Sequence, residues 1–216
     1  MYTTLDKLKL HLGIEFSDES KDELLEYLIE DSTKDIENEC GRSFERNTFT
    51  EYFCGNGSQV IYLKNRPVIS ITSVTINSGE SGSLNTLIET IAASNCDIVD
   101  TAAIFYSGGF PDGRALEEGI VGKYPDPSKT SRNITITYVG GYILPGEEDS
   151  DFPADLEGAC IELCKHKYPY SVQNRNVVSE QIADYKVQYG KSTEYEKDGI
   201  PIRVMRILKR YKGAVI

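Results

Sequence analysis

The spacing of apolar residues changes twice along this 216-residue chain, and that change constrains the fold more than any single motif. Helical spacing runs to about residue 43, alternation with a period of two follows, and helical spacing returns after residue 146. A period of 3.6 indicates an amphipathic helix and a period of two a half-buried strand. We therefore expect an α+β protein, namely a small antiparallel helical bundle with a large β-rich insertion, barrel- or sandwich-like, between the second and third helices.

The same pattern predicts four parts. Residues 1–43 supply the N-terminal helices of the bundle and residues 44–145 the β-rich insertion. Residues 146–178 supply the returning core helix and a linker, and residues 179–216 a C-terminal strand or linker followed by a basic helix. The weakest pattern lies within residues 84–130, for which the topology and the role stay open.

Capping residues predict where the first two helices begin and end. Thr4 is a candidate N-cap for a short helix that Gly13 ends. Ser17 or Ser20 is a candidate N-cap for a longer acidic helix that ends at Gly41. A third helix is expected to run from Pro153 to Tyr168, before Pro169.

The second and third predicted helices carry apolar stripes at three- and four-residue steps. Stripes of this kind pack against each other, so we expect the two helices to form an antiparallel pair. The predicted helix-pairing core consists of Leu24, Leu25, Leu28, Ile29, Ile36, Leu156, Ala159, Cys160 and Leu163.

A β-hairpin is predicted at the start of the insertion. Alternation up to Cys54 leads into Gly55-Asn56-Gly57-Ser58, and an apolar run follows at Val60–Leu63. Further strands are expected at Ile69–Ile76, Cys96–Val99, Ala103–Tyr106, Asn133–Val139 and Asp184–Tyr189, and a last helix at Ile200–Tyr211.

No residue set assembles a catalytic or metal site. The chain has two histidines, His11 and His166, and five cysteines without a paired Cys-x-x-Cys spacing. We expect no enzyme activity, no cofactor and no metal. A small enzyme with Cys54 or Cys164 as nucleophile is the alternative.

Charge is distributed unevenly. The net charge of −11 argues against a protein that grips duplex DNA, which needs a basic surface. Residues 1–41 hold twelve acidic and four basic side chains, whereas residues 199–216 hold five basic and no acidic ones. Such asymmetry is typical of contact surfaces. No apolar run suits a membrane span and the N-terminus lacks a signal-peptide pattern, so we expect the chain to stay in the cytoplasm where it is made.

The order of several segments resembles a known family. These segments are ELLEYLIEDSTKDIENECGRSF, TEYFCGNGSQVIYLKNRPVISITSVTIN, NITITYVGGY, PADLEGACIELCKHKY and SEQIADYKVQYG, ahead of a basic C-terminal helix. In this order they resemble the head–tail connector proteins (adaptor or head-completion proteins) of tailed bacteriophages and prophages.

The resemblance implies a non-enzymatic virion protein at the head–tail junction, made in the bacterial host cytoplasm. Such adaptors form a ring, typically a dodecamer, beneath the portal protein. The ring extends the DNA channel, lets the genome pass without specific binding, does not involve a membrane, and docks stopper or tail-completion proteins. Alternatives are a stopper or tail-completion protein itself, or a DNA-packaging accessory factor.

The resemblance also implies a portal-binding segment, which corresponds here to Ile200–Ile216. Its basic side chains are the expected polar contacts, and Met205, Leu208 and Tyr211 the expected apolar anchors. The full predicted portal-binding set is Arg203, Met205, Arg206, Leu208, Lys209, Arg210 and Tyr211.

Overall fold

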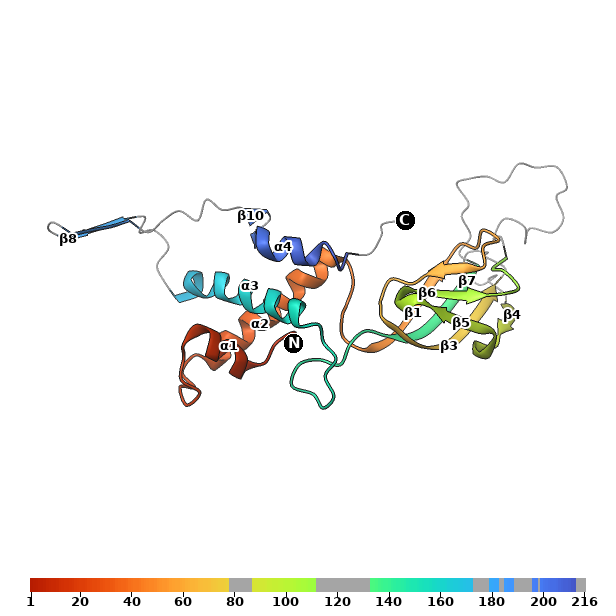
Figure 1. Ribbon diagram of the computed structural model, residues 1–216, viewed down its shortest axis with the longest axis horizontal. Helices are drawn as coiled ribbons and strands as arrows, with labels where there is room; N and C mark the ends of the chain where they lie inside the picture. The colour runs from red at the N-terminus through yellow and green to blue at the C-terminus, as the bar shows by residue number, and fades with distance from the viewer. Residues whose placement is uncertain are drawn as a thin grey trace. The chain divides into compact units, whose positions relative to one another are not determined.

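A computed structural model describes residues 1–77, 87–111, 133–172, 179–182, 185–188, 196–197 and 199–212. The chain divides into two compact units, which are described separately (Figure 1). The helical unit consists of Met1–Arg42 together with Ile143–Ile216, and the β unit of Ser43–Tyr142. The predicted α+β class is confirmed, since the described residues form four α-helices and several antiparallel sheets.

The helical unit is built from four helices drawn from both ends of the chain. They are α1 (Leu5–Leu12), α2 (Asp22–Cys40), α3 (Ala154–Val172) and α4 (Ile202–Leu208). Helices α2, α3 and α4 contact one another, and α1 contacts α2 and α3. Two short antiparallel pairs also belong to this unit, β8 (Ser179–Ile182) with β9 (Tyr185–Gln188) and β10 (Glu196–Lys197) with β11 (Ile200–Pro201).

The caps predicted for α1 and for the end of α2 are confirmed. Thr4 Oγ1 accepts a hydrogen bond from the backbone N–H of Lys7 at 3.4 Å. Gly13 and Gly41 follow the two helices in the left-handed conformation, with φ of 70° and 68°. Glycine adopts this conformation without the steric cost that a Cβ brings.

The prediction that Ser17 or Ser20 caps α2 is wrong. Lys21 occupies the N-cap position and makes no capping hydrogen bond through its side chain. The Ser20 hydroxyl instead donates to Asp18 Oδ1 at 2.5 Å, and the Ser20 N–H donates to the same oxygen at 3.0 Å. The serine is therefore engaged in a local turn before the helix begins.

A buried lysine holds the segment between α1 and α2. The Lys9 side chain is only 2% exposed, and its ammonium donates to the carbonyls of Phe16 at 3.3 Å and Asp18 at 3.0 Å. The same nitrogen lies 2.5 Å from Asp22 Oδ1. Burying a charge is costly unless it is paired, and these three oxygens compensate the cost. Together they fix the entry into α2 at Asp22.

The predicted end of the third helix is also wrong, because α3 continues through Pro169 to Val172. Proline removes one backbone donor and is poorly tolerated in a helix interior. Pro169 lies in the last turn of α3, where only a few residues follow and the local disruption ends with the helix.

The β unit contains two antiparallel sheets. The first has the order β1–β7–β3–β4, from Asn47–Phe53, Ile134–Gly140, Val68–Asn77 and Leu87–Ile91. The second has the order β2–β6–β5, from Val60–Tyr62, Ala103–Tyr106 and Cys96–Val99. Of the two expected forms of the insertion, the structure excludes the closed barrel, because the strands fall into separate sheets.

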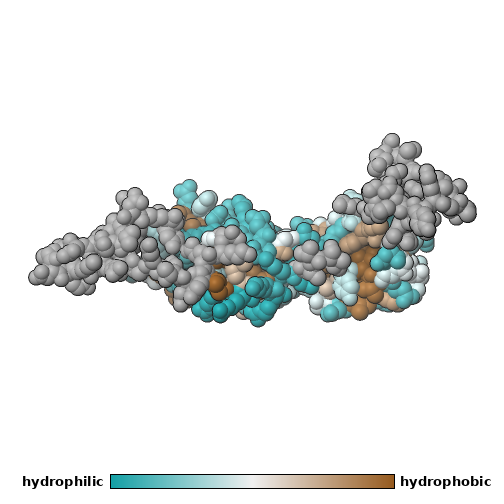
Figure 2. All heavy atoms as spheres, turned by 90° about the horizontal axis from the view of Figure 1, so that it is seen from above, coloured by the Kyte–Doolittle hydropathy of each residue, from teal (hydrophilic) through white to brown (hydrophobic). Residues whose placement is uncertain are grey.

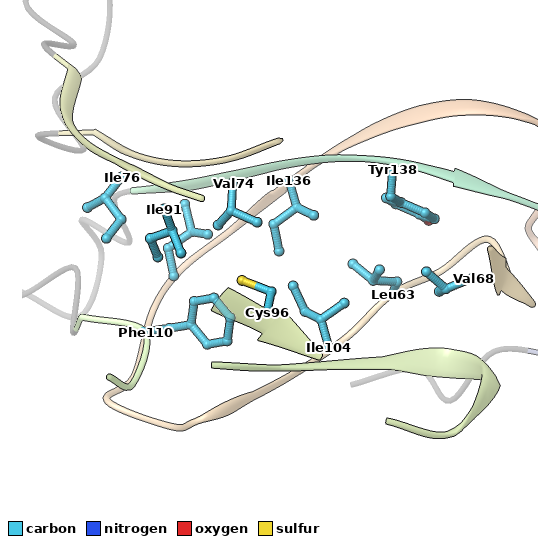
Figure 3. Packing of buried hydrophobic residues seen from close by; sticks show 11 residues of the cluster. Leu63, Val68, Val74, Ile76, Ile91, Cys96, Ile104, Phe110, Ile136 and Tyr138 are labelled. Carbon is cyan, nitrogen blue, oxygen red and sulfur yellow. The ribbon is translucent and has the colours of Figure 1, made fainter. Parts of the chain in front are cut away.

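The core of the β unit lies between the two sheets. Val74, Ile136 and Tyr138 of the four-stranded sheet face Cys96 and Ile104 of the three-stranded sheet (Figure 3). The remaining buried members of this cluster are Leu63, Val68, Ile76, Ile91, Phe110 and Ile134. The strictly alternating burial of β7 follows from this arrangement, since every second side chain enters the core.

The predicted hairpin between β1 and β2 is wrong. Strand β1 pairs with β7 over Asn47↔Gly140 to Phe53↔Ile134, and β2 pairs with β6. The residues of the predicted turn bind distant segments instead. The Gly55 N–H donates to Asn133 Oδ1 at 2.8 Å, and a Cβ on Gly55 would lie 1.9 Å from the Pro111 carbonyl oxygen.

A buried polar network ties the segment between β2 and β3 to the four-stranded sheet. The Tyr138 hydroxyl donates to Glu51 and accepts from the Asn65 N–H at 3.0 Å. Glu51 also accepts from Asn65 Nδ2 at 3.2 Å and from the Lys64 N–H. Burial, and the hydrogen bond to Glu51, raise the pKa of Tyr138, so the hydroxyl keeps its proton and remains a donor.

We expect Tyr138→Phe to destabilise the β unit by about 1–3 kcal/mol, because it leaves buried acceptors and donors without a partner. Urea unfolding of the full chain measures the change. Tyr52→Phe is the matched control, since Tyr52 is 58% exposed, and it should lie within about 0.5 kcal/mol of wild type. Equal stability of the two variants would contradict the role assigned to this network.

Candidate protein interaction surface

Helix α4 is positioned by packing on one side only. Pro201 precedes it in an extended conformation, with φ −57° and ψ 140°, so the helix begins at Ile202. Val204 and Leu208 are fully buried and Met205 is nearly so. The Cys40 thiol, at the end of α2, donates to the Leu208 carbonyl oxygen at a sulfur–oxygen distance of 3.8 Å.

The opposite side of α4 is basic and exposed. Arg203, Arg206, Lys209 and Arg210 are all exposed to solvent. At 100° per residue Arg203 and Arg206 lie on the side away from Val204, Met205 and Leu208, and Lys209 and Arg210 directly follow the end of the helix. We call these four residues the basic α4 surface.

Two ion pairs connect the residues that follow α4 to α3 and α2. Arg210 Nη2 lies 3.0 Å from Asp155 Oδ2 at the start of α3, and the Tyr211 hydroxyl donates to Asp155 Oδ1 at 2.5 Å. Lys212 forms an ion pair with Glu39 near the end of α2. Within the described part of the chain, Arg203, Arg206 and Lys209 form no ion pair.

The seven residues predicted to bind a portal therefore divide into two groups. Met205 and Leu208 are buried inside the helical unit, and the Tyr211 hydroxyl is bonded to Asp155. The contacts of these three residues within the helical unit hold α4 in place, and Tyr211 stays half-buried. The four residues of the basic α4 surface remain accessible to another protein.

The predicted helix-pairing residues lie in the interior of the helical unit. Leu24 is half-buried, and the other eight residues of the set are buried. The Cys164 thiol of α3 lies 3.5 Å from the Leu28 carbonyl oxygen and 3.3 Å from Ser32 Oγ, both on α2. Helices α2 and α3 thus contact each other through a mixed apolar and polar surface.

Sequence reasoning missed the ionic part of this contact. Lys167 Nζ of α3 lies 2.6 Å from Asp31 Oδ2 and 2.6 Å from Asp35 Oδ2 of α2. Burial alone would lower the pKa of Lys167, but the hydrogen bonds to both carboxylates outweigh it and raise the pKa. The four-residue spacing of the two aspartates, on the α2 surface beside its apolar stripe, was the available signal.

Four of the five cysteines are buried. All five are free thiols, and only Cys54 is exposed. Burial raises the pKa of Cys40 to about 11. A hydrogen bond from Cys160 holds the pKa of Cys164 below its usual range, yet the Cys164 side chain is fully buried and out of reach of a substrate.

Other ligand chemistry finds no support in the part of the chain that the structure describes. No group of three or more His, Cys, Asp or Glu side chains there is placed to hold a metal ion. Among the same residues, none of the helices combines the length and the apolar character that crossing a membrane requires.

Comparison with known proteins identifies the type of protein that this chain resembles. Residues 2–89 match the family model of the Phage gp6-like head-tail connector protein. This match confirms the resemblance to bacteriophage head–tail connectors and covers α1, α2 and the first strands of the β unit. No curated protein matches the chain.

Solved structures extend the likeness to nearly the whole fold. A chain in the neck of an empty gene transfer agent particle computed with C6 symmetry has a TM-score of 0.54 and 15% identity. A chain in the virion of the native gene transfer agent particle has a TM-score of 0.52 and 13% sequence identity. A chain in the neck of the native particle, computed with C12 symmetry, has a TM-score of 0.51 and 14% sequence identity. The alignments cover 98% of this chain and 89–90% of those chains. At these identities the likeness shows a shared fold.

We expect Leu208→Ala to destabilise the helical unit by about 2–5 kcal/mol, because it removes a fully buried side chain and leaves a cavity. Arg206→Ala, on the exposed side of the same helix, should change stability by less than about 0.5 kcal/mol. Urea unfolding of both variants measures the difference. Equal effects would show that α4 is not packed as described.

Proposed function

We propose that the protein is a structural, non-enzymatic head–tail connector that forms a ring beneath the portal protein of a phage-like particle. The ring extends the DNA channel and docks a tail or stopper protein on its far side. The family match over residues 2–89 is the observation that carries this proposal. The likeness to neck chains, which extends over 98% of the chain, supports it. The protein is made in the bacterial host cytoplasm and incorporated at the head–tail junction.

The portal contact is assigned to the basic α4 surface. The buried residues Val204, Met205 and Leu208 fix α4 on the helical unit, so the basic residues are presented on a preorganised helix. A rigid surface loses less conformational entropy on binding than a mobile tail does. Arg203, Arg206 and Lys209 are free of ion pairs within the described residues, so they are available to acidic groups of a partner.

The acidic surface of α2 is assigned to the DNA channel. Glu23, Glu26 and Glu30 are exposed and lie along one side of α2 at steps of three and four residues. The chain as a whole carries a net charge of −11. A channel that repels phosphates weakly lets DNA pass without being held, because each basic contact would add affinity through counterion release.

A charge-reversal experiment tests the portal contact. We expect Arg203→Glu combined with Arg206→Glu to weaken binding to the portal protein of the same particle by at least about tenfold, since attraction becomes repulsion. Pull-down or biolayer interferometry at two salt concentrations measures the effect. Lys34→Glu is the matched control, because Lys34 is also exposed and basic but lies on α2.

Unchanged portal affinity of the double variant would refute the assignment of the basic α4 surface. Wild-type protein that binds a tail protein and not the portal would favour the alternative function of a stopper or tail-completion protein.

A second experiment tests the channel assignment. We expect Glu23→Lys, Glu26→Lys and Glu30→Lys together to create salt-dependent retention on duplex DNA that the wild type lacks. Electrophoretic mobility shifts at increasing salt measure the retention. In assembled particles, the triple variant should slow DNA ejection. Ejection at the wild-type rate would place this side of α2 away from the channel.

A further inference from the structure

The β unit carries an unusual outer surface on its four-stranded sheet. Its inward residues fill the core, so the alternate residues of β1 and β7 point outward, together with the β3 residues that pair with the outward residues of β7. Representative outward residues in adjacent registers are Tyr52, Thr135 and Thr75, followed by Thr50, Thr137 and Ser73. Across 48–52, 70–75 and 135–139, no outward residue is charged. We call this surface the threonine face.

The outer surface of the three-stranded sheet is apolar. Ile61 and Ile104 belong to the core, so their strand neighbours point outward. The outward residues with solvent exposure are Val60 and Tyr62 on β2, Phe105 on β6, and Asp97 and Val99 on β5. Tyr62 is 61% exposed and Val99 45% exposed. We call this surface the apolar face.

Charge depletion of this extent is unusual for surfaces that stay in water. The solvent side of an antiparallel sheet normally carries polar and charged side chains, and 26% of this chain is charged. The two faces together contain one charged residue, Asp97, among the outward positions just described. Interface centres show the same depletion of charge together with enrichment of Tyr and Phe. Pale and brown surface over the β unit contrasts with the mostly teal helical unit in the view of Figure 2.

The positions and the chemistry of the two faces favour another copy of this chain as the partner. They lie on opposite sides of one unit, because the core is between the two sheets (Figure 3). They also differ in chemistry, since hydroxyl and β-branched groups dominate one face and aromatic and aliphatic groups the other. Two different surfaces on opposite sides of a subunit suit head-to-tail association, in which each copy offers one face to each neighbour.

We propose that the threonine face of one copy packs against the apolar face of the next copy, sheet against sheet, and that this contact closes the ring. The inference rests on the proposed function, which supplies the ring. Sheets packed face to face interlock their side chains across a flat surface, and neither face presents a row of charges that would oppose this packing.

Single charged substitutions on each face test the contact. Tyr62→Glu alters the apolar face and Thr50→Glu the threonine face, and both positions are exposed in the isolated chain, so both variants should fold. We expect either variant to bind the portal protein without forming a closed ring in electron micrographs. Ser94→Glu, exposed on the 3-10 turn between β4 and β5, is the control and should form rings as the wild type does.

Closed rings from either face variant would overturn the proposed contact. Failure of the wild type itself to form rings on the portal would instead contradict the proposed function, so the two failures are distinguishable.

A mixing experiment tests the head-to-tail arrangement. The Tyr62→Glu copy keeps an intact threonine face, and the Thr50→Glu copy an intact apolar face, while the two altered faces are both negative and repel each other. An equimolar mixture should therefore give a one-to-one dimer that grows no further, at least about tenfold more abundant in native mass spectra than a dimer of either variant alone. A mixture with no more dimer than the separate variants would overturn the arrangement.

Discussion

The pairing of β1 with β7 is the constraint on which the rest of the structure depends. The ladder begins at Asn47↔Gly140, and just before it the Tyr142 N–H donates to the Phe44 carbonyl oxygen at 2.8 Å. The Arg46 N–H returns a hydrogen bond to the Tyr142 carbonyl oxygen at 2.8 Å. The chain therefore leaves and re-enters the helical unit at adjacent points, and the closure entropy of the long insertion is offset by one continuous ladder.

A glycine makes this closure possible. Gly141 has a φ of 95°, and a Cβ there would lie 2.4 Å from the Glu45 carbonyl oxygen. Because the two strand ends meet without a side chain between them, Met1–Arg42 and Ile143–Ile216 can build one helical unit from two distant segments.

Features set by local sequence could be predicted, whereas long-range partners could not. The first helix between Thr4 and Gly13 depends on capping groups within its own turns, and the structure confirms it. The glycine-rich segment after β1 carries a strong local hairpin signal, but Asn133 and Pro111 recruit Gly55 into contacts across the unit. The start of α2 was mispredicted for a related reason, because the buried Lys9 ammonium fixes the preceding segment.

The sequence predicted that the candidate site is basic, but not which of its residues are buried. Sequence alone identified the basic residues near the C-terminus, since composition shows them directly. It could not separate Met205 and Leu208, which hold α4 in place, from Arg203 and Arg206, which face solvent, because the partners of the apolar residues come from distant segments. The two charge-poor faces of the β unit could not be predicted from the sequence either, since they depend on which strands pair.

Electron microscopy of the protein mixed with the portal protein of its own particle tests the central claim most directly. A structural connector should appear as a closed ring seated on the portal, coaxial with the DNA channel, with the basic α4 surface against the portal. A protein that stays monomeric and leaves the portal bare under the same conditions would contradict the account.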